Sequence, residues 1–401
     1  MREQHISSSD LSALIDHREV LGLARKMIRI PSKFNEEERI SKFIFDTLDR
    51  WGLSPSSVEV AGCGPDVVAE TGPRGAPALV LNGHMDTVAV AQGWKHDPYG
   101  AQVSEGRLYG LGSLDMKSGL AGLMIAFRTL SENKLARGVN VKLQAVTGEE
   151  LNGIGTRVLV NRGEFKRARV AVVGEGFGGL NVITNGRRGG YYYDIYIRGK
   201  SAHGALPEMG INAVVDASRI VCAIDAMKMS KAPGLISEDM KPLRESQLVQ
   251  RISGGTTSLS VPDACSIRVV RSLVPGRRGD PGREIAAVID RLRLRSQVRV
   301  ELDDRPGEVY EPYFTSPATE LVRSAREEVL EVTGRPPKLV CGVSEADDNI
   351  IAEETGVPVI CVGPGETGAL ANYHQAEESI DVSQLKPACE VYCRLAVSLA
   401  R

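Results

Sequence analysis

Residues 78–86 read Ala-Leu-Val-Leu-Asn-Gly-His-Met-Asp, a short apolar run that ends abruptly in polar residues. Three later segments repeat this arrangement: 141–146 before Thr147-Gly148-Glu149-Glu150, 170–173 before Gly174-Glu175, and 358–362 before a glycine-rich loop and His374. The apolar runs are nearly continuous rather than alternating, which is typical of strands in a sheet that is covered on both faces.

Longer segments with helical periodicity separate these strands, at residues 37–50, 117–131, 318–333 and 382–400. Strands that alternate with helices along the chain favour an α/β fold. We therefore predict a doubly wound, mainly parallel sheet.

The middle of the chain has a different pattern. Strand-like segments at 191–197, 247–252, 264–270 and 298–302 are interleaved with helical segments at 211–229 and 282–295. This β-α-β-β-α-β order is the split βαβ pattern of a small α+β domain. We predict a catalytic domain of residues 1–187 and 306–401, interrupted by an inserted domain of residues 188–305.

Composition narrows the classes of function. The chain has 401 residues, enough for two domains, and a formal net charge of −2, which gives no overall field to attract nucleic acid or an anionic membrane. No apolar run approaches the roughly 18 residues of a membrane span, and the first ten residues lack the apolar stretch of a secretory signal. Seven cysteines without a CxxC pair indicate free thiols, so a cytoplasmic location is expected.

The polar residues that follow the strands predict one site. In open α/β sheets, ligands bind outside the carboxyl ends of the strands, and four strands bring His84, Glu150, Glu175 and His374 to that edge. Asp115 precedes the helix predicted at 117–131 and, taken alone, would be an N-cap residue. Together with the other four residues, it favours a metal site.

Charge counting gives this site a composition. Three carboxylates (Asp115, Glu150, Glu175) and two neutral imidazoles (His84, His374) suit two divalent cations, with zinc expected and cobalt or manganese as alternatives. One bridging hydroxide would bring the total charge to zero, with Asp115 bridging the ions. Asp86 is placed to orient His84, and Glu149 remains available as the general base.

These residues resemble the dinuclear zinc hydrolases that include aminoacylase, acetylornithine deacetylase, succinyl-diaminopimelate desuccinylase and glutamate carboxypeptidases. The resemblance covers nearly the whole chain. It is carried by GHMDTV (83–88), SLDMKSGLAG (113–122), TGEE (147–150), VVGEG (172–176), KSAHGALPEMGINAV (200–214), LVPG (273–276) and NYHQAEESI (372–380).

The resemblance implies that His84 and Glu175 bind one ion and that Glu150 and His374 bind the other. It also implies that His203 polarises the substrate carbonyl and that the inserted domain is a lid through which the chain forms a homodimer. In dimeric relatives this histidine reaches the partner's centre, and we expect the same here. The alternative is that His203 caps a helix of the lid.

The activity we expect is hydrolysis of an amide bond in an N-acyl amino acid or small peptide. Arg271 and Arg188 could pair with a carboxylate of this small-molecule substrate, unless they face solvent on the lid. Hydrolysis of N-carbamoyl amino acids is an alternative within hydrolases. A non-catalytic binding or assembly module is the alternative from another class.

The glycine-rich loop after residue 362 reads Gly363-Pro364-Gly365-Glu366-Thr367-Gly368 and fits a GxGxxG pattern. No βαβ unit follows it, so we do not expect a dinucleotide site. We predict instead that Gly363 and Gly365 shape the substrate pocket.

Overall fold

The four apolar strands lie side by side at the centre of one large sheet in the computed structural model, which describes residues 8–400 except 74, 136, 278, 304–308 and 367–372. The strands are β6 (Asn140–Val146), β3 (Ala78–His84), β7 (Ala168–Val173) and β18 (Val359–Cys361), in that order. Each is parallel to its neighbour. The predicted α/β class is therefore confirmed.

Antiparallel strands extend this parallel centre, so the sheet is mixed. On one side β2 (Asp66–Thr71) pairs with β6, and β1 (Ser56–Val58) pairs with β2. On the other side β8 (Val182–Arg187) pairs antiparallel with β18 and β16 (Tyr313–Phe314), and parallel with β17 (Lys338–Gly342). These flanking strands are short or less apolar, which explains why the sequence pattern missed them.

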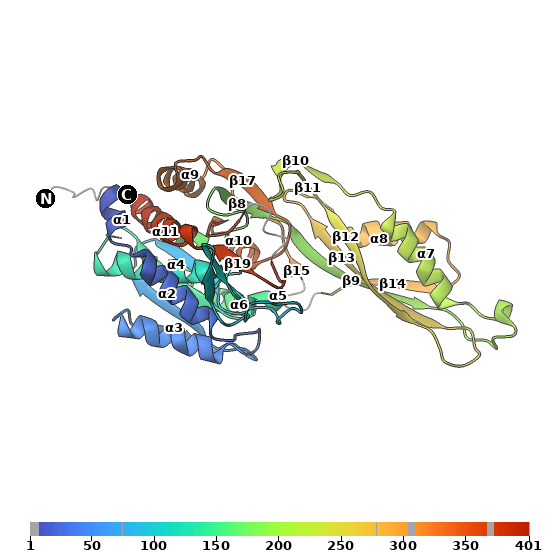
Figure 1. The fold of residues 1–401 in the computed structure, drawn as a ribbon. Helices are drawn as coiled ribbons and strands as arrows, with labels where there is room; N and C mark the ends of the chain where they lie inside the picture. Colours follow the sequence, from blue (N-terminus) through green and yellow to red (C-terminus); the bar gives the residue numbers. More distant parts are fainter. Residues whose placement is uncertain are drawn as a thin grey trace.

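Helices cover both faces of the sheet. The connection from β3 to β6 runs through α4 (Lys117–Glu132), and the connection from β6 back to β7 runs through α6 (Ile154–Arg162). Crossover connections between parallel strands are right-handed. The connection from β3 to β6 and the connection from β6 to β7 run in opposite directions across the sheet, so α4 and α6 lie on opposite faces. Figure 1 shows α2 (His17–Ile28) and α11 (Leu385–Leu399) beside α4, and all three contribute to the main hydrophobic core. Further helices are α1 (Ser8–Ala13), α3 (Glu38–Arg50), α5 (Glu149–Asn152), α9 (Glu320–Thr333) and α10 (Asp347–Thr355).

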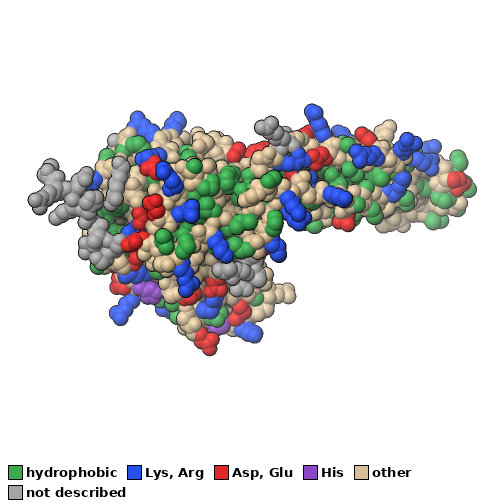
Figure 2. Space-filling view, turned by 90° about the horizontal axis from the view of Figure 1, so that it is seen from above, with side chains coloured by type: hydrophobic (Ala, Val, Ile, Leu, Met, Phe, Trp, Pro, Cys, Tyr) green, Lys and Arg blue, Asp and Glu red, His purple; other side chains and the backbone are tan. Residues whose placement is uncertain are grey.

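A second sheet forms the inserted region. Its strands are β9 (Gly189–Arg198), β12 (Ser246–Gly254), β13 (Ala264–Leu273) and β14 (Gln297–Leu302), in the order β12-β13-β9-β14 and antiparallel throughout. Helices α7 (Ala213–Asp225) and α8 (Pro281–Arg291) pack on one face, each begun by an N-cap side chain, Asn212 and Asp280. We call this region the lid; Figures 1 and 2 show it as an arm that extends away from the body.

The chain enters the lid at Arg188, between β8 of the main sheet and β9 of the lid sheet. The predicted end of the insertion at residue 305 lies outside the described residues. Strand β15 (Val309–Tyr310) still pairs with β9 of the lid sheet, whereas β16 belongs to the main sheet. These pairings support a division into a body and a lid, with the return crossing near residue 311.

A small sheet and a hairpin complete the fold. Strands β19 (Ser379–Asp381), β5 (Arg107–Tyr109) and β4 (Gln102–Ser104) form the small sheet near the carboxyl edge of the main sheet. The hairpin of β10 (Lys231–Ile236) and β11 (Pro242–Arg244) packs its apolar side chains with Cys341 of the body. Among the described residues, no helix is long and apolar enough to cross a bilayer.

Close packing of α4 on the sheet predicts an effect of one added methyl group. A Cβ at Gly119 would lie 2.0 Å from the carbonyl oxygen of Gly174, so either the helix or the strand end must move. We expect Gly119→Ala to reduce the free energy of unfolding by about 2 kcal/mol or more, seen as a lower thermal midpoint. Gly22→Ala in α2 is the control, because nothing lies within 4 Å of its Cβ and alanine favours helix. Equal midpoints for the two variants would contradict this packing.

Candidate metal centre

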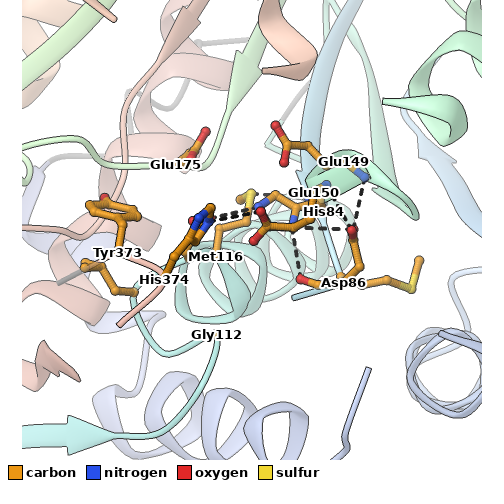
Figure 3. Close-up of polar contacts among 12 residues, drawn as sticks. His84, Asp86, Gly112, Met116, Glu149, Glu150, Glu175, Tyr373 and His374 are labelled. Atoms are coloured by element: carbon orange, nitrogen blue, oxygen red, sulfur yellow. Dashed lines mark hydrogen bonds and ion pairs between the residues drawn. The ribbon is translucent and has the colours of Figure 1, made fainter. Parts of the chain in front are cut away.

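Five ligand-type side chains converge at the carboxyl edge of the main sheet and form two overlapping groups. His84, Asp115 and Glu175 make up one group, and Asp115, Glu150 and His374 make up the other. Within each group the ligand atoms lie within 4.8 Å of one another. Figure 3 shows His84, Glu150, Glu175 and His374 around a common space, with Glu149 beside it. The structure thus brings all five predicted ligands together.

Asp115 lies between the two histidines. One carboxylate oxygen, Oδ1, is 3.0 Å from Nε2 of His84, and the other, Oδ2, is 3.3 Å from Nε2 of His374. The same Nε2 of His374 is 3.0 Å from Oε2 of Glu150. Because each oxygen faces a different imidazole, Asp115 is arranged to serve both groups.

The charges of the site favour bound cations. Burial raises the pKa of Glu175 well above its usual range, and the charge of Asp115 adds to this effect. Hydrogen bonds to Asp115 and Glu150 raise the pKa of His374 to about 10. Burial opposes protonation of His84, but hydrogen bonds to Asp115 and Asp86 still raise its pKa. The carboxylates thus draw positive charge onto both imidazoles, and two divalent ions bound by carboxylate and imidazole would supply that charge more strongly.

Asp86 has two contacts at the site. Its carboxylate accepts hydrogen bonds from the backbone N–H groups of Glu149 and Glu150, at 3.3 and 3.0 Å. Nδ1 of His84 is 3.1 Å from the backbone oxygen of Asp86 and 3.6 Å from its Oδ1. Of the two Asp86 oxygens, the backbone oxygen is thus nearer to Nδ1 of His84, while the carboxylate fixes the turn that carries Glu149 and Glu150.

Glu149 differs from its neighbour Glu150 because it belongs to neither ligand group. Burial raises its pKa well above the usual range, and the negative charges of Asp347 and Glu150 contribute to the same shift. A carboxyl group with a raised pKa, beside the ligands but outside their set, has the properties of a general base.

Glu378 holds the loop that carries Asp115, a role that the sequence pattern did not suggest. Its carboxylate accepts hydrogen bonds from the backbone N–H groups of Gly112, Leu114 and Asp115, at 3.0, 2.8 and 3.1 Å. The adjacent Glu377 accepts from the N–H groups of Lys95 and His96 and lies 2.8 Å from Nδ1 of His96. The pair of glutamates after His374 therefore ties the His374 loop to two neighbouring loops. Their position in the NYHQAEESI segment was the available signal.

Arg187 lies near Glu175 and is fully buried. Its guanidinium is 2.8 Å from the carboxylate of Asp348 and 3.7 Å from Oε2 of Glu175. It also lies over the ring of Phe177, with 4.8 Å from Cζ to the ring centroid. Arg187 thus places a buried positive charge beside the Glu175 carboxylate.

Two arginines predicted to bind substrate have other partners. Arg271 is buried in the lid, where Nη2 contacts Glu245 at 3.0 Å and Glu284 at 3.3 Å. Arg188 donates from Nε to the backbone oxygen of Val343 at 2.8 Å and from Nη1 to that of Arg244 at 3.1 Å. The donors of both arginines are thus directed to partners of the fold, and their contact with a substrate carboxylate stays a prediction. Neither arginine matches the alternative, in which both face solvent on the lid.

The glycines predicted to shape the pocket pack against backbone instead. A Cβ at Gly363 would lie 2.2 Å from the oxygen of Gly174, and one at Gly365 would lie 1.7 Å from the oxygen of Gly176. Glycine is thus required where this loop meets the loop that carries Glu175, and the two residues support a ligand rather than line the pocket. Thr367 and Gly368 of the GxGxxG pattern lie outside the described residues.

His203 lies in the lid and is not a member of either ligand group. Its Nδ1 accepts a hydrogen bond from the N–H of Ala205 at 3.1 Å, within the turn that follows β9. The short 3-10 helix η1 (Pro207–Met209) that follows has Leu206 as its N-cap residue, and the N-cap of α7 is Asn212, so His203 caps neither helix.

A pocket of about 420 Å³ opens beside the ligands. Glu149, Glu150 and His374 line it from the body, and Tyr192, Gln250 and Arg268 line it from the lid. This volume lies within the range of roughly 300–1,000 Å³ that is usual for small-molecule sites.

Comparison with known proteins gives consistent results. Residues 80–398 match the model of the peptidase family M20/M25/M40. A succinyl-diaminopimelate desuccinylase of Marinobacter nauticus is 26% identical over 388 residues, which are 94% of this chain and 98% of that protein. A probable succinyl-diaminopimelate desuccinylase of Staphylococcus epidermidis is 28% identical over 203 residues, so the chain spans only about half (49%) of that relative.

A crystal structure of aminopeptidase PepT from Bacillus cereus has the same fold. It superposes with a TM-score of 0.77 at 21% sequence identity and covers 97% of this chain and 100% of its own.

The shared position of Asp115 predicts unequal effects of ligand substitutions on metal content. Asp115→Ala should reduce the affinity for both ions, whereas Glu175→Ala should weaken mainly the ion held with His84. Because Glu378 anchors the backbone N–H of residue 115, the loop should remain in place in the first variant. Calorimetric titration of metal-free protein with zinc measures both stoichiometries. Two tight sites in Asp115→Ala would contradict the bridging position.

Proposed function

The chain belongs to the peptidase family M20/M25/M40, and on that premise we propose that it uses two divalent metal ions to hydrolyse an amide bond of an N-acyl amino acid or a small peptide. The observation that carries the proposal is the Asp115 carboxylate, with one oxygen facing each imidazole and further carboxylates beside them. Family membership favours this hydrolase over the non-catalytic module and over the N-carbamoyl alternative.

The ligand set supports a specific distribution of the ions. His84 and Glu175 would hold one ion, Glu150 and His374 the other, and Asp115 both. Imidazole and carboxylate ligands together suit zinc, which we propose as the native metal. When bound, the ions would supply Lewis acidity toward the scissile carbonyl and toward water.

The proton transfers fall to Glu149. Its carboxylate lines the pocket, so it can take a proton from the attacking water and return it to the departing amine. A raised pKa suits both steps, because the group must hold the proton between them. Asp86, through the N–H groups of residues 149 and 150, keeps this carboxylate beside the ligands.

Carbonyl polarisation is assigned to His203, in a homodimer joined through the lid. Tyr192 of β9 lines the pocket, and β9 continues for six residues to Arg198, about 20 Å farther along the strand. His203 follows that far end, so a centre on another chain is the better candidate for its contact. Exposed apolar side chains near the lid tip and on edge strand β12 support pairing of two copies; they are Leu206, Met209, Leu248, Ile252 and Leu259.

The seven cysteines support a location in a reducing compartment, and we propose the cytoplasm. All seven are free thiols, and five of them are buried. Buried thiols that form no disulfide are typical of proteins in a reducing environment.

The base assignment predicts a separation of metal binding from turnover. Glu149→Ala should retain two ions and bind substrate while losing about 10²- to 10⁴-fold in kcat, the usual contribution of a general base. Metal analysis and steady-state kinetics on an N-acyl amino acid panel measure the two properties. Turnover close to wild type with metal retained would show that Glu149 is not the base.

The dimer proposal predicts complementation between two inactive variants. Glu149→Ala and His203→Ala should each be nearly inactive as homodimers. After random mixing, about half of the dimers contain one chain of each kind, and each of these has one site with both residues intact, so about a quarter of wild-type activity should return. Absence of recovery in verified mixed dimers would mean that His203 does not act on the partner's centre.

A further inference from the structure

The active-site pocket contains a carboxylate that the proposed reaction does not use. Glu345, in the loop before α10, lines the same pocket as the candidate metal ligands Glu150 and His374. It is not in either ligand group. Its side chain is only partly buried, so its charge is accessible to a bound molecule.

Glu345 is held in a defined place at the junction of body and lid. The side chain lies against Gly190 of β9, where an added Cβ would be 2.5 Å from Oε1. Burial raises the pKa of Glu345, while the nearby Arg188 and a hydrogen bond from Ser272 act to lower it. The carboxylate is thus fixed by its surroundings, with glycine at position 190 leaving room for it.

Nearby arginines do not cancel the negative charge of Glu345. Arg188 interacts through its charge with two carboxylates, Glu345 and Glu238, and it donates hydrogen bonds to the backbone oxygens of Val343 and Arg244. Arg187 is occupied by Asp348 and Glu175. Two arginines therefore face four carboxylates at the junction.

The lid side of the pocket brings no surplus positive charge either. Arg268 is the single lysine or arginine among the described residues that line the pocket. Its Nη1 contacts Asp194 and its Nη2 contacts Asp303, both at 2.9 Å. A substrate carboxylate would have to compete with these two aspartates, whereas a substrate cation would meet an accessible glutamate.

We infer that the substrate carries an ammonium group, which Glu345 recognises while the scissile amide lies at the metal centre. This inference rests on the proposed hydrolase function and specifies its substrate class. The ammonium could be the free amino group of a peptide, on the acyl side of the scissile bond. It could equally be a side-chain amine of the amino acid that is released. Both provide the same charge-assisted hydrogen bond to the carboxylate.

Two matched pairs of substrates test the inference on the zinc-loaded enzyme. L-alanyl-L-leucine and N-propionyl-L-leucine differ only by an ammonium on the acyl side. N-acetyl-L-lysine and N-acetyl-L-norleucine differ by an ammonium on the released side. In at least one pair, the wild-type enzyme should favour the ammonium substrate by on the order of 10- to 100-fold in kcat/KM, the effect of a hydrogen bond to a charged group.

The preference should depend on Glu345. Glu345→Gln should bring the kcat/KM ratio of that pair close to one with two zinc ions still bound. Gly190→Ala should lower the ratio as well, because its Cβ displaces the Glu345 side chain, and it serves if the first variant does not fold. Glu353→Gln, an exposed glutamate on α10 outside the pocket lining, is the matched control and should keep the wild-type ratio.

The outcomes separate this inference from the proposed function. Hydrolysis without an ammonium preference in either pair, or a preference that persists in both Glu345→Gln and Gly190→Ala, would overturn the inference alone. Failure of the zinc-loaded enzyme to hydrolyse any of the four compounds would overturn the proposed function, and the inference with it.

Discussion

Repulsion among buried carboxylates is the constraint on which this structure depends. Asp115, Glu150 and Glu175 are buried or nearly so at one sheet edge, with Glu149 beside them, and burial raises the pKa of each glutamate in this group. Such a concentration of acids is unfavourable in a folded protein unless positive charge is supplied. The two imidazoles lie on either side of Asp115, and divalent ions held by these residues would supply that charge and the Lewis acidity for hydrolysis.

The fold maintains this cluster with backbone hydrogen bonds as much as with side-chain packing. Parallel strands deliver the ligands to one edge, but the loops that carry them would be variable without further anchors. Glu378 holds the Asp115 loop, Asp86 holds the turn of Glu149 and Glu150, and Arg187 forms an ion pair with Glu175. A second set of charged residues, distinct from the ligands, therefore determines the geometry of the site.

The sequence predicted the fold and the site well at positions where a residue type has a single dominant physical role, such as an apolar residue in a buried strand. Continuous apolar strands followed by acids and imidazoles located the parallel sheet and four of the five candidate ligands, and Asp115 was added from the segment before the helix predicted at 117–131. The sequence was less informative where the role of a residue depends on a partner distant in the chain. The sequence suggests that Arg271 binds a substrate carboxylate, but in the structure its guanidinium contacts Glu245. Sequence periodicity cannot predict this pair. Likewise Gly363 and Gly365 suggest a binding loop, yet the approach of another backbone requires them. The role of Glu378 was hidden because acceptors of backbone N–H groups leave no spacing pattern.

All five candidate metal ligands come from the body, whereas the pocket beside them is lined by the body and by the lid. Its open sheet face meets the body at the pocket, where Glu345 and the paired Arg268 set the local charge. The central claim remains the pair of ions that share Asp115, and anomalous diffraction from crystals of the zinc-loaded protein tests it most directly. Two zinc peaks should appear per chain, one contacting His84 and Glu175 and the other contacting Glu150 and His374, with a different oxygen of Asp115 on each. A single peak, or peaks that do not share Asp115, would contradict the account.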